Sequence, residues 1–141
     1  MGRRFWKDQK GQGLVEFAII LPVLLIILLG IVEFGLILYN QHVITNASRE
    51  GARYGIVVRS PRRTAIEIEA VVDAYCADNM VTFGSASPVT AIDPLITSGS
   101  VFGEDLRVDV TFHYDFLILP SFLADLTGGL DLAAHTTMKY E

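Results

Sequence analysis

The feature that most constrains this chain is an apolar run over residues 14–39. It contains two carboxylates, Glu16 and Glu33, and no Lys or Arg. As a helix of about 26 residues at about 1.5 Å per residue it is roughly 39 Å long, more than the approximately 30 Å of bilayer hydrocarbon. A secretory signal has a much shorter apolar region, about 7 to 15 residues. We therefore expect one transmembrane helix over residues 14–39.

The charge distribution gives this span a direction. Four basic residues precede it: Arg3, Arg4, Lys7 and Lys10. Arg49, Arg53 and Arg59 follow it at a greater distance, and basic residues beside a span tend to stay in the cytoplasm. We expect the N-terminus inside and the C-terminal part outside the cytoplasm. The rest of the chain is acidic, which disfavours nucleic-acid binding because no basic stripe is available for phosphates.

Beyond the span, the sequence predicts a small α+β unit. The first helix continues to residue 58, with Val43, Ala47, Ala52 and Ile56 on one face, until Ser60-Pro61 breaks it. A second helix capped by Thr64 follows. Its proposed buried residues are Ile66, Ile68, Val71, Val72, Tyr75, Cys76 and Met80.

A small antiparallel sheet completes the unit. Residues 106–116 alternate between apolar and polar side chains, as a strand with one buried face does. Residues 130–140 are expected to return beside them after the Gly128-Gly129 turn, and a short strand is expected at residues 89–92 within a loop region. Residues 117–126 are expected to form a short helix or turn around Pro120.

The sequence gives little support for catalysis. His42, His113 and His135 are far apart, and none has the spacing of a metal site or a catalytic triad. Cys76, the single cysteine, is interpreted as a small buried residue rather than a reactive thiol. We expect no enzyme activity, no metal and no cofactor.

The two carboxylates in the span need a physical explanation. Glu33 lies at the outer interface if the bilayer begins near Leu14, since about twenty residues cross it. Glu16 lies near the inner edge, where no cation of the helix can meet it. An acid inside a membrane indicates a functional site. Its partner is expected from the exposed terminus or from another molecule.

The segment GQGLVEFAIILPVLLIILLGIVEFGLILYNQHVITNASREGARYG, residues 11–55, resembles the TadE-like family of pilus assembly proteins. The resemblance is carried by several features in order. They are the G-x-x-x-x-E-F start at Gly11, the Leu21-Pro22 pair, Gly30, the Glu33-Phe34-Gly35 triplet and the sequence NASREGAR at residues 46–53. The resemblance implies a pilin-like α+β fold in a Flp or Tad-type pilus system.

The resemblance also implies processing by a prepilin peptidase between Gly11 and Gln12. A second glycine, Gly13, leaves a cut after residue 13 as the alternative. Glu16, with Phe17 beside it, would meet the new N-terminal amine of a neighbouring subunit and set the assembly register. This pairing is physically favourable, because an ammonium and a carboxylate are each costly in hydrocarbon and offset much of that cost together. The implied partners are the peptidase, other pilin or pseudopilin subunits, an inner-membrane assembly platform and the lipid bilayer.

Three further residues have expected roles in the helix. Pro22 either kinks it or is tolerated, because neighbours or water can satisfy the freed carbonyl. Gly51 and Gly55 are expected to let the small domain approach the helix closely. The expected organisation is a basic leader at residues 1–11, a long helix at 12–58 and an extracytoplasmic domain at 59–141.

Two functions from different classes follow. The first is a pseudopilin or minor pilin of a Tad-type pilus that takes part in assembly for adhesion or secretion. The alternative is a permanently anchored extracytoplasmic binding module. Only the first requires removal of residues 1–11.

Overall fold

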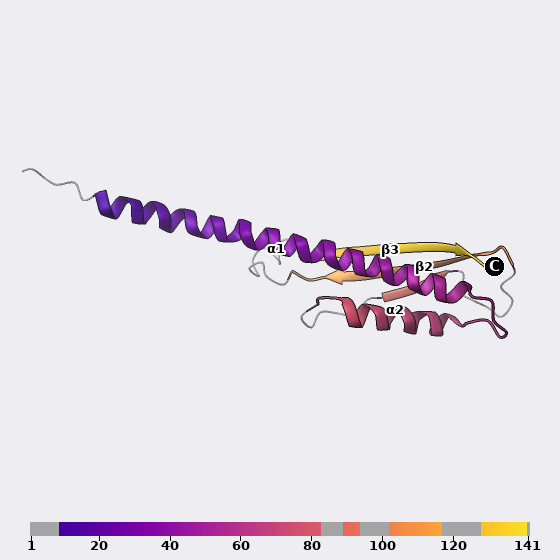
Figure 1. Cartoon of the computed structure of the whole chain (residues 1–141). Helices are drawn as coiled ribbons and strands as arrows, with labels where there is room; N and C mark the ends of the chain where they lie inside the picture. The colour runs from indigo at the N-terminus through magenta and orange to yellow at the C-terminus, as the bar shows by residue number, and fades with distance from the viewer. Residues whose placement is uncertain (1–8, 83–88, 94–101, 117–127, 141) are drawn as a thin grey trace, which may run out of the picture.

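The computed structural model describes residues 9–82, 89–93, 102–116 and 128–140 (Figure 1). Helix α1 spans Gln9–Ile56, α2 spans Ala65–Asn79, and strands β1, β2 and β3 span Val89–Asp93, Asp105–Tyr114 and Leu130–Lys139. The predicted helix around Pro120 and most of the predicted leader lie outside the described residues. The predicted α+β fold is confirmed.

Helix α1 is a single helix of 48 residues that continues through Pro22. The proline therefore does not end the helix, although it removes the backbone donor that would reach the carbonyl of residue 18. From residue 33 onward, buried positions recur at helical spacing. They are Glu33, Asn40, Val43, Ile44, Ala47, Ser48, Gly51, Ala52 and Gly55.

Helix α2 begins at the predicted cap. The Thr64 hydroxyl accepts from the Glu67 N–H at 3.3 Å, and the Glu67 carboxylate accepts from the Thr64 N–H at 2.7 Å. This capping box satisfies donors at the helix start. The predicted buried face is correct for Ile68, Val72 and Cys76.

Ile66 was wrongly expected on the buried face of α2. Its side chain is 76% exposed. The reason is geometric, because two residues along a helix correspond to about 200° of rotation, which places Ile66 opposite Ile68.

The three strands form an antiparallel sheet in the order β1-β2-β3. Strands β2 and β3 pair along their full length, from Asp105 opposite Lys139 to Tyr114 opposite Leu130. The predicted alternation of β2 is confirmed, because every second side chain is buried. The short strand expected at residues 89–92 is present as β1.

One face of the sheet packs on the helices. The core joins α1, α2 and the inner faces of β2 and β3, and Figure 1 shows the two helices running along the sheet. Its buried members include Ile44 and Ala47 from α1, Val72 from α2, and Val108 and Phe112 from β2. Burial also raises the pKa of the Cys76 thiol to about 11, so this thiol stays protonated at neutral pH.

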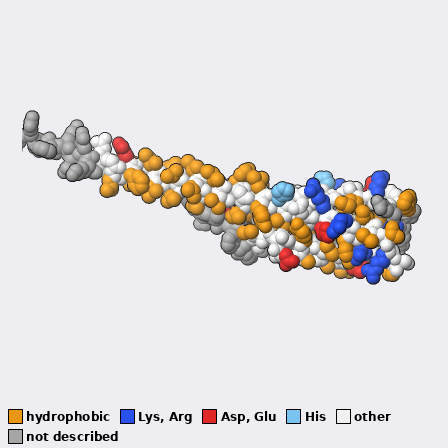
Figure 2. Space-filling model, viewed as in Figure 1, with side chains coloured by type: hydrophobic (Ala, Val, Ile, Leu, Met, Phe, Trp, Pro, Cys, Tyr) orange, Lys and Arg blue, Asp and Glu red, His pale blue; other side chains and the backbone are white. Residues whose placement is uncertain are grey.

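The N-terminal part of α1 extends beyond this packed unit (Figure 1). We call residues 11–32 the stem and residues 33–56 the packed half of α1. Every side chain of residues 11–28 is exposed, and Figure 2 shows an almost continuous hydrophobic surface there. Among the described residues, α1 is the one helix long and apolar enough to cross a membrane. Its composition is compatible with a single-pass membrane protein.

Candidate functional site

The predicted processing and assembly residues all lie at the exposed start of α1. Gly11 is in the first turn of the helix, and Gln12, Glu16 and Phe17 follow on it. A Cβ added at Gly11 or at Gly13 would meet no atom within 4 Å. The Gly11–Gln12 bond therefore lies near the end of α1, where helices fray readily.

Glu16 has no hydrogen bond or ion pair with any other described residue, and its side chain is exposed. Apolar side chains surround its position along the stem, including Leu14 at 71% and Phe17 at 62% exposure. An exposed surface this apolar and this extended indicates contact with lipid or with other chains. The stem therefore carries one carboxylate, Glu16, on a surface that is apolar from Leu14 to Val32 apart from this acid.

Glu33 lies in a different environment. Its side chain is 1% exposed, and its Oε1 accepts a hydrogen bond from the Tyr114 hydroxyl at 2.8 Å. Burial, followed by the contact with Glu33, raises the pKa of Tyr114, so the phenol remains a donor. Tyr114 is the last residue of β2, and this bond fixes the end of the sheet to residue 33 of the helix.

This contact was not predicted from the sequence. Glu33 was expected at the outer membrane interface, and a partner outside the helix was expected for Glu16. The structure supplies a neutral hydroxyl from a residue 81 positions later. The available signal was Tyr114 itself, the last inward-facing polar aromatic of the alternating strand. A buried tyrosine hydroxyl usually finds a hydrogen-bond partner.

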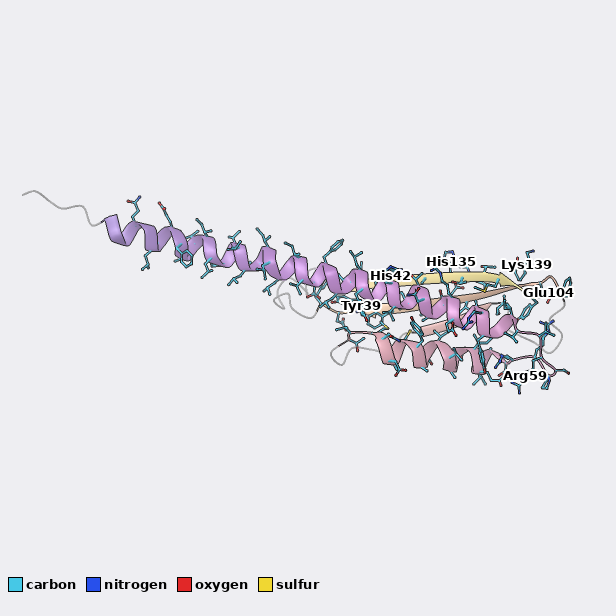
Figure 3. The ribbon with its side chains drawn as sticks, viewed as in Figure 1. Tyr39, His42, Arg59, Glu104, His135 and Lys139 are labelled. Carbon is cyan, nitrogen blue, oxygen red and sulfur yellow. The ribbon has the colours of Figure 1, made fainter. Side chains whose placement is uncertain are left out.

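Two neighbouring side chains of α1 hold the end of α2. The amide of Asn40 donates to the Val81 carbonyl at 2.9 Å and accepts from the Val81 N–H at 3.0 Å. Asn40 thus pairs with a backbone unit as a strand would, and it is fully buried. The Tyr39 hydroxyl donates to the Asn79 carbonyl at 3.0 Å, and Figure 3 shows Tyr39 beside this end of α2.

Gly51 and Gly55 lie where side chains of α2 and β2 come close to the backbone of α1. A Cβ at Gly51 would come within 2.5 Å of Val72 Cγ2. A Cβ at Gly55 would come within 2.4 Å of Leu106 Cδ2 and 2.6 Å of Ile68 Cδ1. Both glycines therefore occupy positions where the neighbouring side chains fill the space of a larger residue.

Polar bonds also join α1 to the edge strand β3. Gln41 donates to the Ala133 carbonyl at 2.9 Å, and the hydroxyls of Ser48 and Thr136 are 2.8 Å apart. Together with the contacts of Glu33 and Asn40, these bonds fix the packed half of α1 to every layer of the domain. The stem is free of these restraints.

His113 forms an exposed polar cluster with two carboxylates. His113 Nδ1 is 2.5 Å from Asp131 Oδ1, and Asp115 lies 3.6 Å from the other ring nitrogen. The hydrogen bond to Asp131 raises the pKa of His113. All three side chains are well exposed. No group of three or more metal-ligating side chains is found within the described ranges.

One comparison with known proteins gives a match. Residues 11–53 match the family model described as TadE-like protein. No curated protein and no solved structure matches the chain. The matched segment contains the G-x-x-x-x-E-F start, the stem and nearly all of the packed half of α1. Its similarity suggests a protein associated with a Tad pilus and with partners in that pilus system. The resemblance to the TadE-like family is thus confirmed, over residues 11–53 of this chain.

Proposed function

We propose that this chain is a pseudopilin or minor pilin of a Tad-type pilus system, inserted in the cytoplasmic membrane with its domain outside. A prepilin peptidase would remove residues 1–11, and the stem would then join other pilin-like subunits during assembly for adhesion or secretion. The observation that carries the proposal is the exposed apolar stem with a single carboxylate, Glu16, five positions after Gly11.

The chemistry of assembly follows from this arrangement. Cleavage after Gly11 creates an ammonium group at Gln12. Two unit charges at about 4 Å interact by about 1 kcal/mol in bulk water and by about 4 kcal/mol at an effective dielectric of 20. A neighbouring subunit whose ammonium lies opposite Glu16 is therefore favoured over one shifted along the stem. The carboxylate selects the register, and the apolar surface supplies the contact area.

The domain supports the same interpretation in a different way. Among the described residues, the hydrogen bonds and the core of the domain engage only the packed half of α1. The stem can therefore leave lipid and enter a bundle of stems without breaking contacts within the domain. The partners of this step would be other pilin-like subunits and the inner-membrane assembly platform.

The intact mass of the membrane-associated chain tests the proposal. Expressed with its pilus system, the chain should lack residues 1–11 and begin at Gln12. Recovery of the full-length form alone, with the peptidase present and active on another substrate, would contradict processing and favour a permanently anchored binding module.

A pair of glycine variants makes this test specific. Gly11→Leu should block the cut. Gly13→Leu should still be cut after Gly11, so its mass should be that of a chain beginning at residue 12. Both sites are open, so neither substitution disturbs packing. If Gly13→Leu blocks the cut and Gly11→Leu does not, the cut lies after Gly13. If both variants are cleaved, the peptidase recognises neither glycine.

A further inference from the structure

A hydrogen bond to Glu33 of α1 fixes the position of the sheet end that lies nearest the stem. The Tyr114 hydroxyl bonds to Glu33 at 2.8 Å, and Leu130, the first residue of β3, pairs with Tyr114 across the sheet. The end of β2 and the start of β3 therefore both lie at the beginning of the packed half. Figure 1 shows these strand ends where the stem emerges from the domain.

The length of the stem places this level at a membrane boundary. Residues 14–32 form an apolar helix of about 19 residues, roughly 28 Å at about 1.5 Å per residue, close to the approximately 30 Å of bilayer hydrocarbon. The sequence-predicted span of residues 14–39 is longer than this, but residues 33 and 40 are buried in the domain and residues 36 and 37 pack on its core. The hydrocarbon therefore ends near Glu33.

Apolar side chains remain exposed at this level. Phe34 is 60% exposed, Leu38 53% and Leu130 44%. Phe116, just after β2, is half-buried and packs edge-on against the Tyr114 ring, with ring centroids 6.2 Å apart. We call these four residues, Phe34, Leu38, Leu130 and Phe116, the proximal rim. They come from α1, from β3 and from the segment just after β2, and they share one end of the domain.

Charged groups beside the rim limit how deep it can lie. His113, Asp115 and Asp131 are exposed at the same strand ends. Carboxylates are costly in hydrocarbon, so these groups must remain among headgroups and water. An apolar rim next to a charged cluster fits the interface between headgroups and acyl chains.

We propose that the proximal rim rests in the outer interface of the bilayer, so that the domain lies on the lipid surface rather than standing away from it. The rim is continuous with the stem, and the stem already fills the hydrocarbon up to Val32. This continuity favours lipid over a second protein as the occupant. Interfacial apolar groups of this kind lie about 5–10 Å into the boundary between headgroups and acyl chains.

Contact of the rim with lipid, in addition to the stem, would fix the distance of the domain from the bilayer surface. Moving α1 out of the membrane would then also remove the rim from lipid.

Nitroxide labels on the uncleaved full-length chain in phosphatidylcholine vesicles test the inference. Single cysteines are introduced at Leu24, Leu130 and Ile66 in a Cys76→Ala background, and accessibility to oxygen and to a water-soluble nickel chelate is measured. Leu130 and Ile66 are exposed in the domain, so both tolerate a label. Ile66 is the matched control, because it lies in the first turn of α2, at the end of the domain away from the stem.

The expected ratio of oxygen to nickel accessibility is highest at position 24, intermediate at 130 and lowest at 66, with the value at 130 several-fold above that at 66. Equal ratios at 130 and 66, with position 24 in lipid, would overturn the inference. Exclusion of both reagents at 130 would also overturn it, because that result indicates coverage by a second protein chain.

This inference rests on the proposed membrane-spanning stem, but not on cleavage or assembly. A label at position 24 that is open to the nickel chelate would overturn both the membrane-spanning stem and the rim contact. A chain that is cleaved at Gly11 in cells, but whose position 130 is in water, would overturn only the rim contact.

Discussion

The two halves of α1 place the same residue type in opposite situations. Glu16 in the stem is exposed, with no bond to another described residue, whereas Glu33 in the packed half is buried and bonded to Tyr114. The helix is continuous between them, so the difference comes from what covers it. The domain supplies the partner of Glu33. No described residue partners Glu16; under the proposed function its partner is the N-terminal ammonium of a neighbouring subunit. The contrast separates an acid that holds the fold from one that is exposed.

The same contrast holds for phenylalanine, and it gives the largest expected effect. Phe112 in the core is 1% exposed, whereas Phe17 in the stem is 62% exposed. Phe112→Ala should lower the free energy of unfolding by about 3–5 kcal/mol, the usual cost of a large cavity. Phe17→Ala should leave it nearly unchanged. Denaturant unfolding in detergent micelles measures the free energy of unfolding of both variants. Equal decreases in the two would contradict the division of α1 into a stem and a packed half.

Glycine substitutions give the next largest effect. Gly55→Ala would force Leu106 and Ile68 to move and should destabilise by about 1–3 kcal/mol, as overpacking does. Gly30→Ala meets open space and should be neutral or stabilising by up to about 1 kcal/mol, because alanine favours a helix. The same unfolding measurement applies. An unchanged free energy of unfolding for Gly55→Ala would show that Leu106 and Ile68 do not pack closely against residue 55.

Glu33 allows a sharper substitution. Glu33→Leu leaves the buried Tyr114 hydroxyl without this acceptor and should cost about 1–3 kcal/mol. Glu33→Gln keeps a carbonyl acceptor and should recover most of the loss. The control Tyr114→Phe removes the hydroxyl, so Glu33→Leu in that background should cost less. Additive losses in this double-mutant cycle would rule out the bond as a stabilising contact.

The smallest effect concerns pH. Asp131, and more weakly Asp115, raise the folded-state pKa of His113 above its usual value of about 6.5. Its contribution to stability is therefore full below about pH 6.5 and is lost as the pH rises through the folded-state pKa. The effect should be small, since the site is exposed. His113→Gln should flatten that part of the stability profile, measured by denaturant unfolding at a series of pH values; an unchanged profile would contradict the link to His113.

Local patterns were sufficient to predict the elements of the fold. The alternation of β2, the cap at Thr64 and the helical spacing of Val43, Ala47 and Ala52 each depend on neighbours in sequence. Two contacts do not depend on sequence neighbours. The Tyr114–Glu33 bond joins residues that are separated by 81 positions, and the Asn40–Val81 pairing joins residues that are separated by 41. Their geometry depends on how far the domain reaches along α1, which periodicity does not specify.

The candidate site divides in the same way. The roles expected of Gly11, Glu16 and Phe17 come from a resemblance carried by one continuous segment, and they stay predictions. The burial of Glu33 and Asn40 against the domain was not predicted in this way. An apolar sequence alone does not distinguish side chains that face lipid from those that face a domain.

The most direct test of the central claim is pilus production by a Glu16→Ala variant, expressed in place of the natural chain and checked for membrane insertion and N-terminal mass. The stem is exposed at this position, so the variant should fold, insert and lose residues 1–11 as usual. The account predicts that pilus production is nevertheless strongly reduced. Normal pilus production by the cleaved and inserted variant would contradict the role of Glu16 in assembly.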